Sequence, residues 1–378
     1  MTRVLFISSV IDGGSPRSQR ALAHGLIERG HEVVFVVDDQ RRASMSRVVG
    51  EQLADASVRF EHLRSLQRLA SLPGSRPPHR TIDHLAHWTS PHPHNALPQV
   101  LDEFNPDVVV GNSIDRHSWR RTLDICRTRH ISTVLYIREV PALRHLEIEP
   151  SPADVLVANA QTLAESARTQ GHRCEFIPSV VDTTPTRTES TRKTALLINP
   201  IASHGVNIAI ELARRAPDVE FVFQESWPLD DAEWGRLVEV VAPLNNVELR
   251  RRSEPGPQLY ASARVLLVPH RIDNRPRVIV EAQANAIPAI ISQHPGLDEA
   301  AGPAAIAVDE DDVEGWAEAL DWVFNDEARY RRLVAVTRKA SQRPELDPAY
   351  VVNTFERVLE EVQTIDLATG HQSWSNTA

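Results

Sequence analysis

The sequence has few of the residues that build disulfide bonds, metal clusters or polybasic surfaces. Its 378 residues include only two cysteines, Cys126 and Cys174, in no metal-like spacing, and only two lysines, Lys193 and Lys339. The formal net charge is -10, which argues against a general binder of nucleic acid or of anionic membranes. The cysteine usage fits a reducing compartment, so we expect the protein in the cytoplasm.

Long apolar runs are also missing. No stretch approaches the roughly 18 consecutive apolar residues of a membrane-spanning helix. The chain begins MTRVLFISSVIDGG, where an apolar run of eight residues follows Arg3 and ends at Asp12 without a cleavage-site pattern. This run predicts a buried first strand and not a signal peptide, and any membrane contact is expected to be peripheral.

Short apolar runs alternate with helical patterns along the whole chain, which predicts parallel sheets with helices on both faces. A polar stretch, DTTPTRTESTRKT, interrupts the alternation at residues 182–194, and the pattern then restarts. The predicted fold class is α/β, with two Rossmann-like doubly wound domains that face a central cleft. These domains occupy residues 1–181 and 195–347. The stretch 182–194 links them, a helix over residues 348–365 can cross back to the first domain, and residues 366–378 form a loose tail.

One segment of the first domain breaks this alternation. Residues 60–98 contain SLPGSRPPHR and HWTSPHPHN and are rich in His, Pro and Ser. Such an irregular insertion usually lies on the surface or lines a site. Its histidines are residues 62, 79, 84, 87, 92 and 94. None of them forms a helical i, i+4 pair with an acidic partner, so we predict no metal site.

Turns that follow strands deserve scrutiny, because ligands of open α/β sheets bind beyond the carboxyl ends of the strands. In the first such turn, DGGSPRS, Gly13 and Gly14 lead into a helix for which Ser15 is the expected cap and Pro16 the expected first residue. Free backbone N–H groups there can hold an anion. The turn lacks the GxGxxG spacing, so a tight turn with a capped helix is an equal interpretation.

A second turn lies at the start of the other domain, in INPIASHGVNIAIELA. A strand is predicted to end at Asn199 and a helix to begin near Gly205. The helix N-terminus offers a positive dipole and unpaired donors suited to phosphate. A loop with a structural cap explains the same residues.

The third turn, RIDNRPRVIVEA, is the most highly charged. It carries Asp273, Arg275 and Arg277, and Pro276 can start the helix that holds Glu281. Arg277 and Glu281 are i, i+4 neighbours, which fits a surface ion pair. The same two side chains could instead clamp a diphosphate and accept hydrogen bonds from a ribose diol.

The run from Asp273 to Ser292 resembles the acidic motif of retaining GT-B glycosyltransferases of the bacterial family 4 type, which reads approximately E-x-F/W-G-R-V-x-x-E-A-x-x-x-G-I-P-V. The residues on pattern are Asp273, Arg277, Val278, Glu281, Ala282, Gln283, Ile287 and Pro288. Further segments similar to the family are GGSPRSQRALAHGLIERGHEV, PADVLVANAQTLAES and HPGLDEAAG, so the likeness covers nearly the whole chain.

The resemblance implies roles for these residues. The first domain would bind the acceptor and the second the nucleotide-sugar donor. Glu281 would hold the nucleotide ribose, and Asp273 would contact the transferred sugar near the reacting carbon. Gly13 and Gly14 would let the backbone approach the diphosphate and the acceptor. Glu299, in the PGLDE turn, would be structural.

The departures from the family pattern weaken the phosphate site. Asn199 and His204 stand where the family commonly has an arginine and a lysine that neutralise the leaving diphosphate. Pro276 replaces a glycine and removes an N–H donor. Loss of such a clamp costs on the order of a hundredfold in rate. Candidates for compensation are Arg275, Arg277 and a protonated His204.

A further pair of charged residues is expected at the cleft. The strand in VLYIREV ends with Arg138 and Glu139, where many family members carry a histidine. Glu139 could orient an acceptor hydroxyl or amine, and Arg138 could meet an anionic acceptor or a phosphate. A salt-bridged strand end is the alternative.

The predicted function is that of a retaining glycosyltransferase that moves a hexose or related sugar from a nucleotide diphosphate donor to a small acceptor. The resemblance implies no metal and no cofactor beyond the donor, and the long insertion favours natural-product biosynthesis. The alternative is a degenerate GT-B protein that binds a nucleotide sugar or a partner enzyme without turnover; a sugar epimerase matches the motif less well. The base, sugar, acceptor and oligomeric state stay open.

Overall fold

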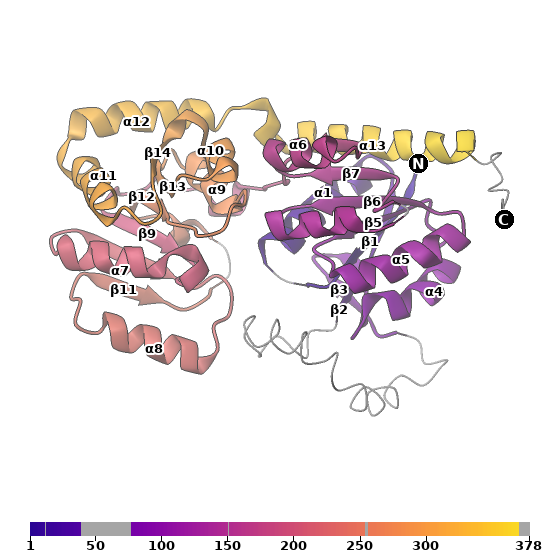
Figure 1. Cartoon of the computed structure of the whole chain (residues 1–378). Helices are drawn as coiled ribbons and strands as arrows, with labels where there is room; N and C mark the ends of the chain where they lie inside the picture. Colours follow the sequence, from indigo (N-terminus) through magenta and orange to yellow (C-terminus); the bar gives the residue numbers. More distant parts are fainter. Residues whose placement is uncertain (12, 39–76, 150, 254–255, 370–378) are drawn as a thin grey trace.

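The computed structural model describes residues 1–11, 13–38, 77–149, 151–253 and 256–369. Figure 1 shows two α/β domains side by side, with a long C-terminal helix lying along the first domain. The predictions for residues 60–76, including His62, and for residues 370–378 fall outside the described residues.

The N-terminal domain is built on an eight-stranded sheet with the order β3-β4-β2-β1-β5-β6-β7-β8. Its strands are β1 (Arg3–Ser8), β2 (Glu32–Asp38), β3 (His79–Ile82), β4 (Leu85–Ser90), β5 (Val108–Asn112), β6 (Ser132–Ile137), β7 (Val155–Ala158) and β8 (Cys174–Phe176). The neighbouring strands are parallel except for the β3–β4 pair. The central strands are buried on both faces, which explains their continuous apolar runs.

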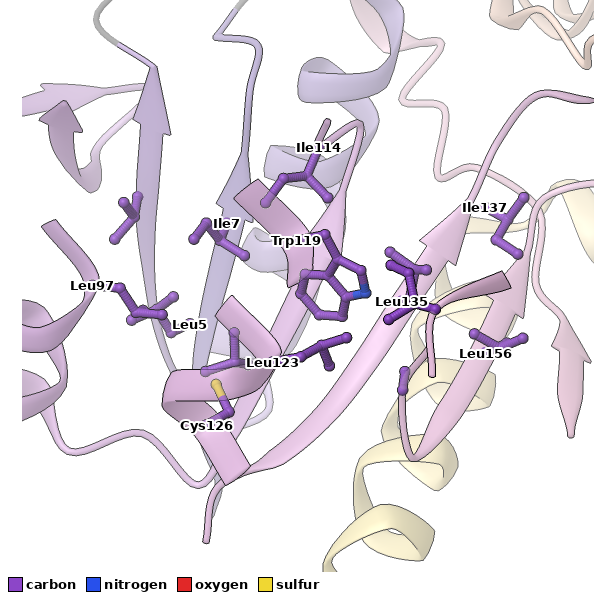
Figure 2. Close-up of a cluster of buried hydrophobic side chains, with 14 of the residues drawn as sticks. Leu5, Ile7, Leu97, Ile114, Trp119, Leu123, Cys126, Leu135, Ile137 and Leu156 are labelled. Atoms are coloured by element: carbon purple, nitrogen blue, oxygen red, sulfur yellow. The ribbon is translucent and has the colours of Figure 1, made fainter. Parts of the chain in front are cut away.

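Helices cover both faces of this sheet. They are α1 (Gly14–Glu28), α4 (Pro93–Phe104), α5 (Arg116–Thr128), η2 (Val140–Glu147) and α6 (Gln161–Thr169). Side chains of α4, α5 and α6 share one core with Leu5 and Ile7, whereas Val4 and Phe6 point to the opposite core. Figure 2 shows Trp119 at the centre of the first core. Its indole approaches Gly111 so closely that a Cβ there would lie 2.5 Å from the ring.

The C-terminal domain has a six-stranded parallel sheet with the order β11-β10-β9-β12-β13-β14. The strands are β9 (Thr194–Ile198), β10 (Glu220–Gln224), β11 (Val247–Arg250), β12 (Ala263–Val268), β13 (Ala289–Ser292) and β14 (Ala305–Val308). The helices are α7 (Val206–Arg215), α8 (Asp231–Val241), α9 (Arg277–Ala284), α10 (Pro295–Ala301), α11 (Val313–Asn325) and α12 (Glu327–Ala340). Short 3-10 turns complete the chain at Thr184–Thr186, Ala202–His204, Pro257–Leu259, Gly302–Ala304 and Pro344–Leu346.

The last helix, α13 (Pro348–Thr369), packs on the N-terminal domain and together with α1 covers the second core. Phe355 lies between the rings of Phe6 and Tyr136, at centroid distances of 6.3 Å to each. The first residues of the chain therefore share a core with the last helix. Helix α13 runs through residues 366–369, which the sequence analysis placed in a loose tail.

The prediction that residues 60–98 are irregular is wrong for their C-terminal half. Strands β3 and β4 form a hairpin at the edge of the sheet, and α4 begins at Pro93. Asp83 and His84 both have positive φ, which allows the tight turn between the strands. The ring of His87 stacks on Phe35 at 4.5 Å, so a residue read as part of a polar loop is buried in the sheet.

Candidate functional site

The third turn identified in the sequence meets the first turn across the two domains. Arg277 opens α9, and its Nη1 donates to the hydroxyl of Ser18 on α1 at 3.3 Å. A Cβ placed on Gly14 would lie 3.5 Å from Cδ of Arg277. Close by in the chain, Asn274 forms an isolated antiparallel bridge with Glu139 at the end of β6. Two turns that are far apart in sequence thus form one site.

Glu281 lies in this site and is 9% exposed. Its Oε2 accepts a hydrogen bond from the hydroxyl of Tyr260 at 2.9 Å, and its Oε1 accepts one from Nη2 of Arg277 at 3.3 Å. Burial, with help from the Glu281 charge, raises the pKa of Tyr260 well above its usual value, so the phenol stays a donor. The Arg277–Glu281 ion pair, which one of the two interpretations placed on the surface, is largely buried, with side chains 15% and 12% exposed. A buried carboxylate held by a phenol and a guanidinium remains able to accept further hydrogen bonds.

Asp273 has a partner within its own domain. Its Oδ1 accepts from the backbone N–H of Gly296 in the first turn of α10, at 2.8 Å. A Cβ on Gly296 would lie 2.7 Å from that oxygen, so the close approach depends on glycine. The negative charge of Asp273 adds to burial in raising the pKa of Asp298. One carboxylate oxygen of Asp273 therefore has a structural role.

The turn between β1 and α1 differs from its sequence interpretation. The helix begins at Gly14 with Gly13 as its N-cap, at φ 110°, so the prediction of Ser15 as cap and Pro16 as first residue is wrong. Glycine reaches this backbone conformation, which residues with a Cβ rarely adopt. The Ser15 hydroxyl instead lies 2.7 Å from that of Ser113 and accepts from Nδ2 of Asn112 at 3.0 Å. Gly13 has no side chain, so the N-cap residue provides no side-chain acceptor for the first N–H groups of α1.

Arg138 is buried at the carboxyl end of β6. Its Nε donates to Oδ1 of Asn112 and its Nη1 to the hydroxyl of Ser179. The guanidinium lies 4.0 Å above the ring of Tyr136. Burial lowers the pKa of Arg138 and the charge of Arg277 lowers it further, while Tyr136 opposes the shift. Its neighbour Glu139, by contrast, is exposed and turns its side chain to solvent.

Arg275 is also buried, at 9% exposure, and its Nε has no hydrogen-bond partner in the described parts of the chain. Its guanidinium lies 5.7 Å from the ring centre of Phe176 on the N-terminal domain. Burial lowers the pKa of Arg275, as does Arg343, whereas Glu299 raises it. This residue therefore lies at the contact between the domains.

The turn between β9 and α7 is occupied by interactions within its own domain. Oδ1 of Asn199 accepts from the backbone N–H groups of Ser226 and Trp227, at 2.9 and 2.7 Å. The ring of His204 stacks on His270 at 4.1 Å. Burial and His204 together lower the pKa of His270 to about 3. Gly205, the N-cap of α7, packs against the backbone just beyond β12: a Cβ there would lie 1.9 Å from the carbonyl oxygen of Pro269.

Sequence reasoning missed Tyr260, Ser18, Asn112, Ser179 and Trp227. Trp227 lies between the two glycine turns, 5.0 Å from His204 by ring centroids and with Nε1 3.7 Å from a Cβ placed on Gly13. It follows the end of β10, so the rule that sites lie beyond strand ends could have found it. Asn112 ends β5 and Ser179 follows the end of β8, so the same rule applies to them. No local signal marks Tyr260 or Ser18, which come near the site only through the fold.

Two kinds of feature are absent from the described residues. No group of three or more His, Cys, Asp or Glu side chains is placed to hold a metal ion. The rings of His92, His94 and His117 lie near one another, and burial with the two neighbours lowers the pKa of His94 to about 4. Within the same part of the chain, every helix is too short or too polar to cross a membrane.

Comparisons with known proteins give a family match within the C-terminal domain. Residues 241–340 match the family model described as "Glycosyl transferases group 1", and this range contains Asp273, Arg277 and Glu281. A comparison with curated proteins finds no match.

The solved structures that resemble the chain cover nearly all of it. Sucrose-phosphate synthase from Thermosynechococcus elongatus has a TM-score of 0.75 at 12% identity, over 97% of this chain and 100% of that one. Anabaena HepE in complex with UDP-glucose has a TM-score of 0.71 at 12% identity, over 96% and 100%. UDP-GlcNAc 2-epimerase from Neisseria meningitidis, bound to UDP-GlcNAc, has a TM-score of 0.58 at 12% identity, over 95% and 100%.

At such low identity these likenesses establish the fold alone, and the epimerase shows that this fold also serves another reaction. The family match adds a second, independent finding in the C-terminal domain. The chain therefore has the GT-B fold, with a group 1 glycosyl transferase match over residues 241–340 that contains the acidic motif.

Proposed function

We propose that this protein is a glycosyltransferase that takes a sugar from a nucleoside diphosphate donor and passes it to a small acceptor. The observation that carries the proposal is the buried Arg277–Glu281 pair, which opens α9 and reaches α1 of the other domain. The group 1 match includes both residues. HepE in complex with UDP-glucose, a protein of the same fold, supports the donor class.

The donor would bind with its ribose at Glu281 and its diphosphate at Arg277. A carboxylate accepts hydrogen bonds from both hydroxyls of a diol, and Tyr260 keeps this one in place. Arg277 lies next to the first turn of α1, where backbone N–H groups and the helix dipole favour an anion. Gly13 and Gly14 leave this turn accessible, since no Cβ covers it. Asp273 would contact the sugar through its second carboxylate oxygen.

The reaction we propose retains the anomeric configuration, in line with a family 4 type enzyme. The bond between sugar C1 and the β-phosphate oxygen breaks, and its electron pair goes to that oxygen. The acceptor oxygen forms the new bond to C1 from the same face, and its proton passes to a phosphate oxygen. Arginines and helix N-termini, without a metal, would stabilise the leaving charge. Contact between the domains would exclude water and favour transfer over hydrolysis.

The acceptor would lie on the side of the N-terminal domain. Glu139 is exposed and its backbone pairs with Asn274, so its carboxylate is near the donor turn and free to orient a hydroxyl or amine. A small natural product is the acceptor class we propose. The two cysteines are buried free thiols, which fits a reducing cytoplasm as the place of action.

The test is calorimetry with UDP, GDP and dTDP, followed by measurement of donor hydrolysis and transfer with the corresponding sugar nucleotides. We expect one nucleotide to bind to the wild type and Glu281→Ala to weaken that binding and reduce turnover about a hundredfold. Glu318→Ala, an exposed change on α11 of the same domain, is the matched control. Failure of the wild type to bind any nucleoside diphosphate would sink the proposal.

A second candidate is a degenerate GT-B protein that binds a nucleotide sugar or a partner enzyme without turnover. The turn between β9 and α7 favours it, because residues 199–205 contain no arginine or lysine and Asn199 is engaged by two backbone N–H groups. Binding of a donor without any hydrolysis or transfer would select this candidate.

A further inference from the structure

We propose that Arg138 is a catalytic residue: a phosphate clamp that reaches from the N-terminal domain and supplies the positive charge that the turn of residues 199–205 lacks. The inference rests on the proposed function, because it assumes a diphosphate leaving group. It assigns Arg138 to that group and not to the acceptor. It also makes the clamp a joint product of both domains.

The first argument is the burial of Arg138 without a counter-ion. The side chain is almost completely withdrawn from water, yet no Asp or Glu of the described residues lies within ion-pair distance of it. Its partners are neutral: the amide oxygen of Asn112, the hydroxyl of Ser179 and the ring of Tyr136. An uncompensated buried charge is costly, so an anionic ligand beside Arg138 would offset part of that cost.

A second buried arginine in the same domain, Arg20, is paired with a carboxylate, which is the usual way in which a buried charge is compensated. Arg20 is 7% exposed and donates to Oδ2 of Asp83 and to the carbonyl oxygen of Ile11. A buried arginine with a structural role is thus paired with a carboxylate here. Arg138 differs from it in the one respect that matters for binding an anion.

The third argument is position. Asn112 receives Nε of Arg138 through its oxygen and donates through its Nδ2 to Ser15 in the first turn of α1. Arg277 reaches the same turn from the other domain, through Ser18. The charge of Arg277 also adds to burial in lowering the pKa of Arg138, as expected for two guanidinium groups that face the same turn. An anion at the N-terminus of α1 would therefore be flanked by one arginine from each domain.

In this arrangement, Arg138 supplies the positive charge that the turn of residues 199–205 lacks. Part of the Arg277 charge is already offset by Glu281, and His204 is stacked on His270 within its own domain. When the C1–oxygen bond breaks, the electron pair goes to the β-phosphate oxygen, and N–H groups of Arg138 would stabilise that charge. Because Arg138 belongs to the N-terminal domain, full stabilisation requires that domain to be in contact with the donor.

The experiment compares Arg138→Gln, Arg138→Lys and Arg138→Ala with the wild type, using the nucleotide and sugar donor that the wild type accepts. We expect Arg138→Gln to lower kcat about a hundredfold or more, and to weaken nucleoside diphosphate binding more than nucleoside binding. Lysine should restore part of the rate. Added guanidinium ion should restore part of the activity of Arg138→Ala, a response that a purely structural role would not produce.

The matched control is Arg20→Gln, which removes the carboxylate-paired buried arginine of the same domain and should leave the ratio of diphosphate to nucleoside affinity unchanged. Circular dichroism of each variant checks that it folds. If the wild type turns over a donor and folded Arg138→Gln does so equally well, the clamp is disproved while the proposed function stands. If kcat falls but neither lysine nor guanidinium restores any of it, the clamp is also disproved. A wild type that binds no diphosphate would refute the proposed function itself.

Discussion

The two domains begin their first crossover in the same way but use that turn differently. Each has a glycine with positive φ as the N-cap of the helix: Gly13 at 110° before α1 and Gly205 at 70° before α7. A Cβ on Gly205 would lie 1.9 Å from the carbonyl oxygen of Pro269. A Cβ on Gly13 would meet nothing nearer than Nε1 of Trp227, at 3.7 Å. One glycine is required for packing, and the other leaves space.

The polar residues around the two turns differ in the same sense. In the C-terminal domain, Asn199 binds the backbone of the next loop and His204 stacks on a neighbouring histidine. In the N-terminal domain, Ser15 and Asn112 form a hydrogen-bonded chain that ends at Arg138, a cation with no counter-ion among the residues that the structure describes. The turn of the C-terminal domain is thus filled by packing, whereas the turn of the N-terminal domain is the one to which we assign the anion in the proposed function.

The largest effect we expect is the loss of stability in Gly205→Ala. The left-handed backbone costs a residue with a Cβ about 1–2 kcal/mol, and the overlap with the Pro269 backbone adds strain that no flexible side chain can relieve. We predict a total loss of about 3–5 kcal/mol in the free energy of unfolding, measured in urea.

Gly13→Ala is the comparison that can break this contrast. Its backbone is also strained, but the space around it is open, so we expect a loss of about 1–3 kcal/mol. Nucleoside diphosphate affinity should fall in Gly13→Ala even where the protein is folded. Equal losses of stability in the two variants would show that the turns do not differ as described.

The contrast also shows which parts of the site are readable from sequence. Pro276, Arg277 and Glu281 are close in the chain, and helix geometry alone places the last two side by side. The alternation of buried runs likewise indicates two parallel sheets, because a strand covered on both faces must be apolar throughout. Both features depend on local spacing, so they could be predicted.

Partners brought together by the packing of helices and domains could not be predicted. Ser18 is 259 positions from Arg277, and Tyr260 is 21 positions from Glu281. The sequence around Ser18 or Tyr260 does not indicate its partner, because both pairings follow from how the domains and the helices pack. Ser15 was misread for a related reason: its hydroxyl has a better partner on β5 than the helix N-terminus, and the adjacent glycine takes the cap position.

A third helix N-terminus sharpens the comparison, because an anion already occupies it. The backbone N–H groups of Gln161 and Thr162, which begin α6, donate to the Glu299 carboxylate from the other domain at 2.7 and 2.9 Å. Removing this carboxylate in Glu299→Ala should cost about 1–2 kcal/mol, as loss of a helix cap does. We expect hydrogen exchange at these two amides to become about tenfold faster.

Asp298→Ala is the matched control, since this exposed residue lies on the same helix, α10, one position earlier. Its pKa is raised by burial and by Asp273, so its removal relieves unfavourable charge and should not speed exchange in α6. Unchanged exchange at Gln161 and Thr162 in Glu299→Ala would mean that this contact does not hold the domains together in solution.

The smallest effect we expect concerns α13, which follows the C-terminal domain in the sequence but packs on the N-terminal domain. The carboxylate of Glu356, on α13, is hydrogen-bonded to Nε2 of His31 at 2.9 Å and accepts from Nη1 of Arg29 at 3.0 Å. The contact with His31 lowers the pKa of Glu356 below its ordinary 4.5, and the contact with Arg29 lowers it further. Burial opposes this shift. A lowered folded pKa means that the stabilisation is present above pH 4.5 and is lost as the pH falls through the folded value. The side chain is 25% exposed, so solvent screening limits the effect to about 0.5 kcal/mol at pH 7.

Glu356→Gln should therefore weaken the packing of α13 near neutral pH, which would be seen as faster hydrogen exchange in that helix. In acid, the exchange rates of the variant should match those of the wild type. The control is Glu361→Gln, because Glu361 also lies on α13 and forms a more exposed ion pair with Arg173. Hydrogen exchange in α13 should change less in this variant. A larger change than in Glu356→Gln would show that the contacts at His31 do not hold the helix.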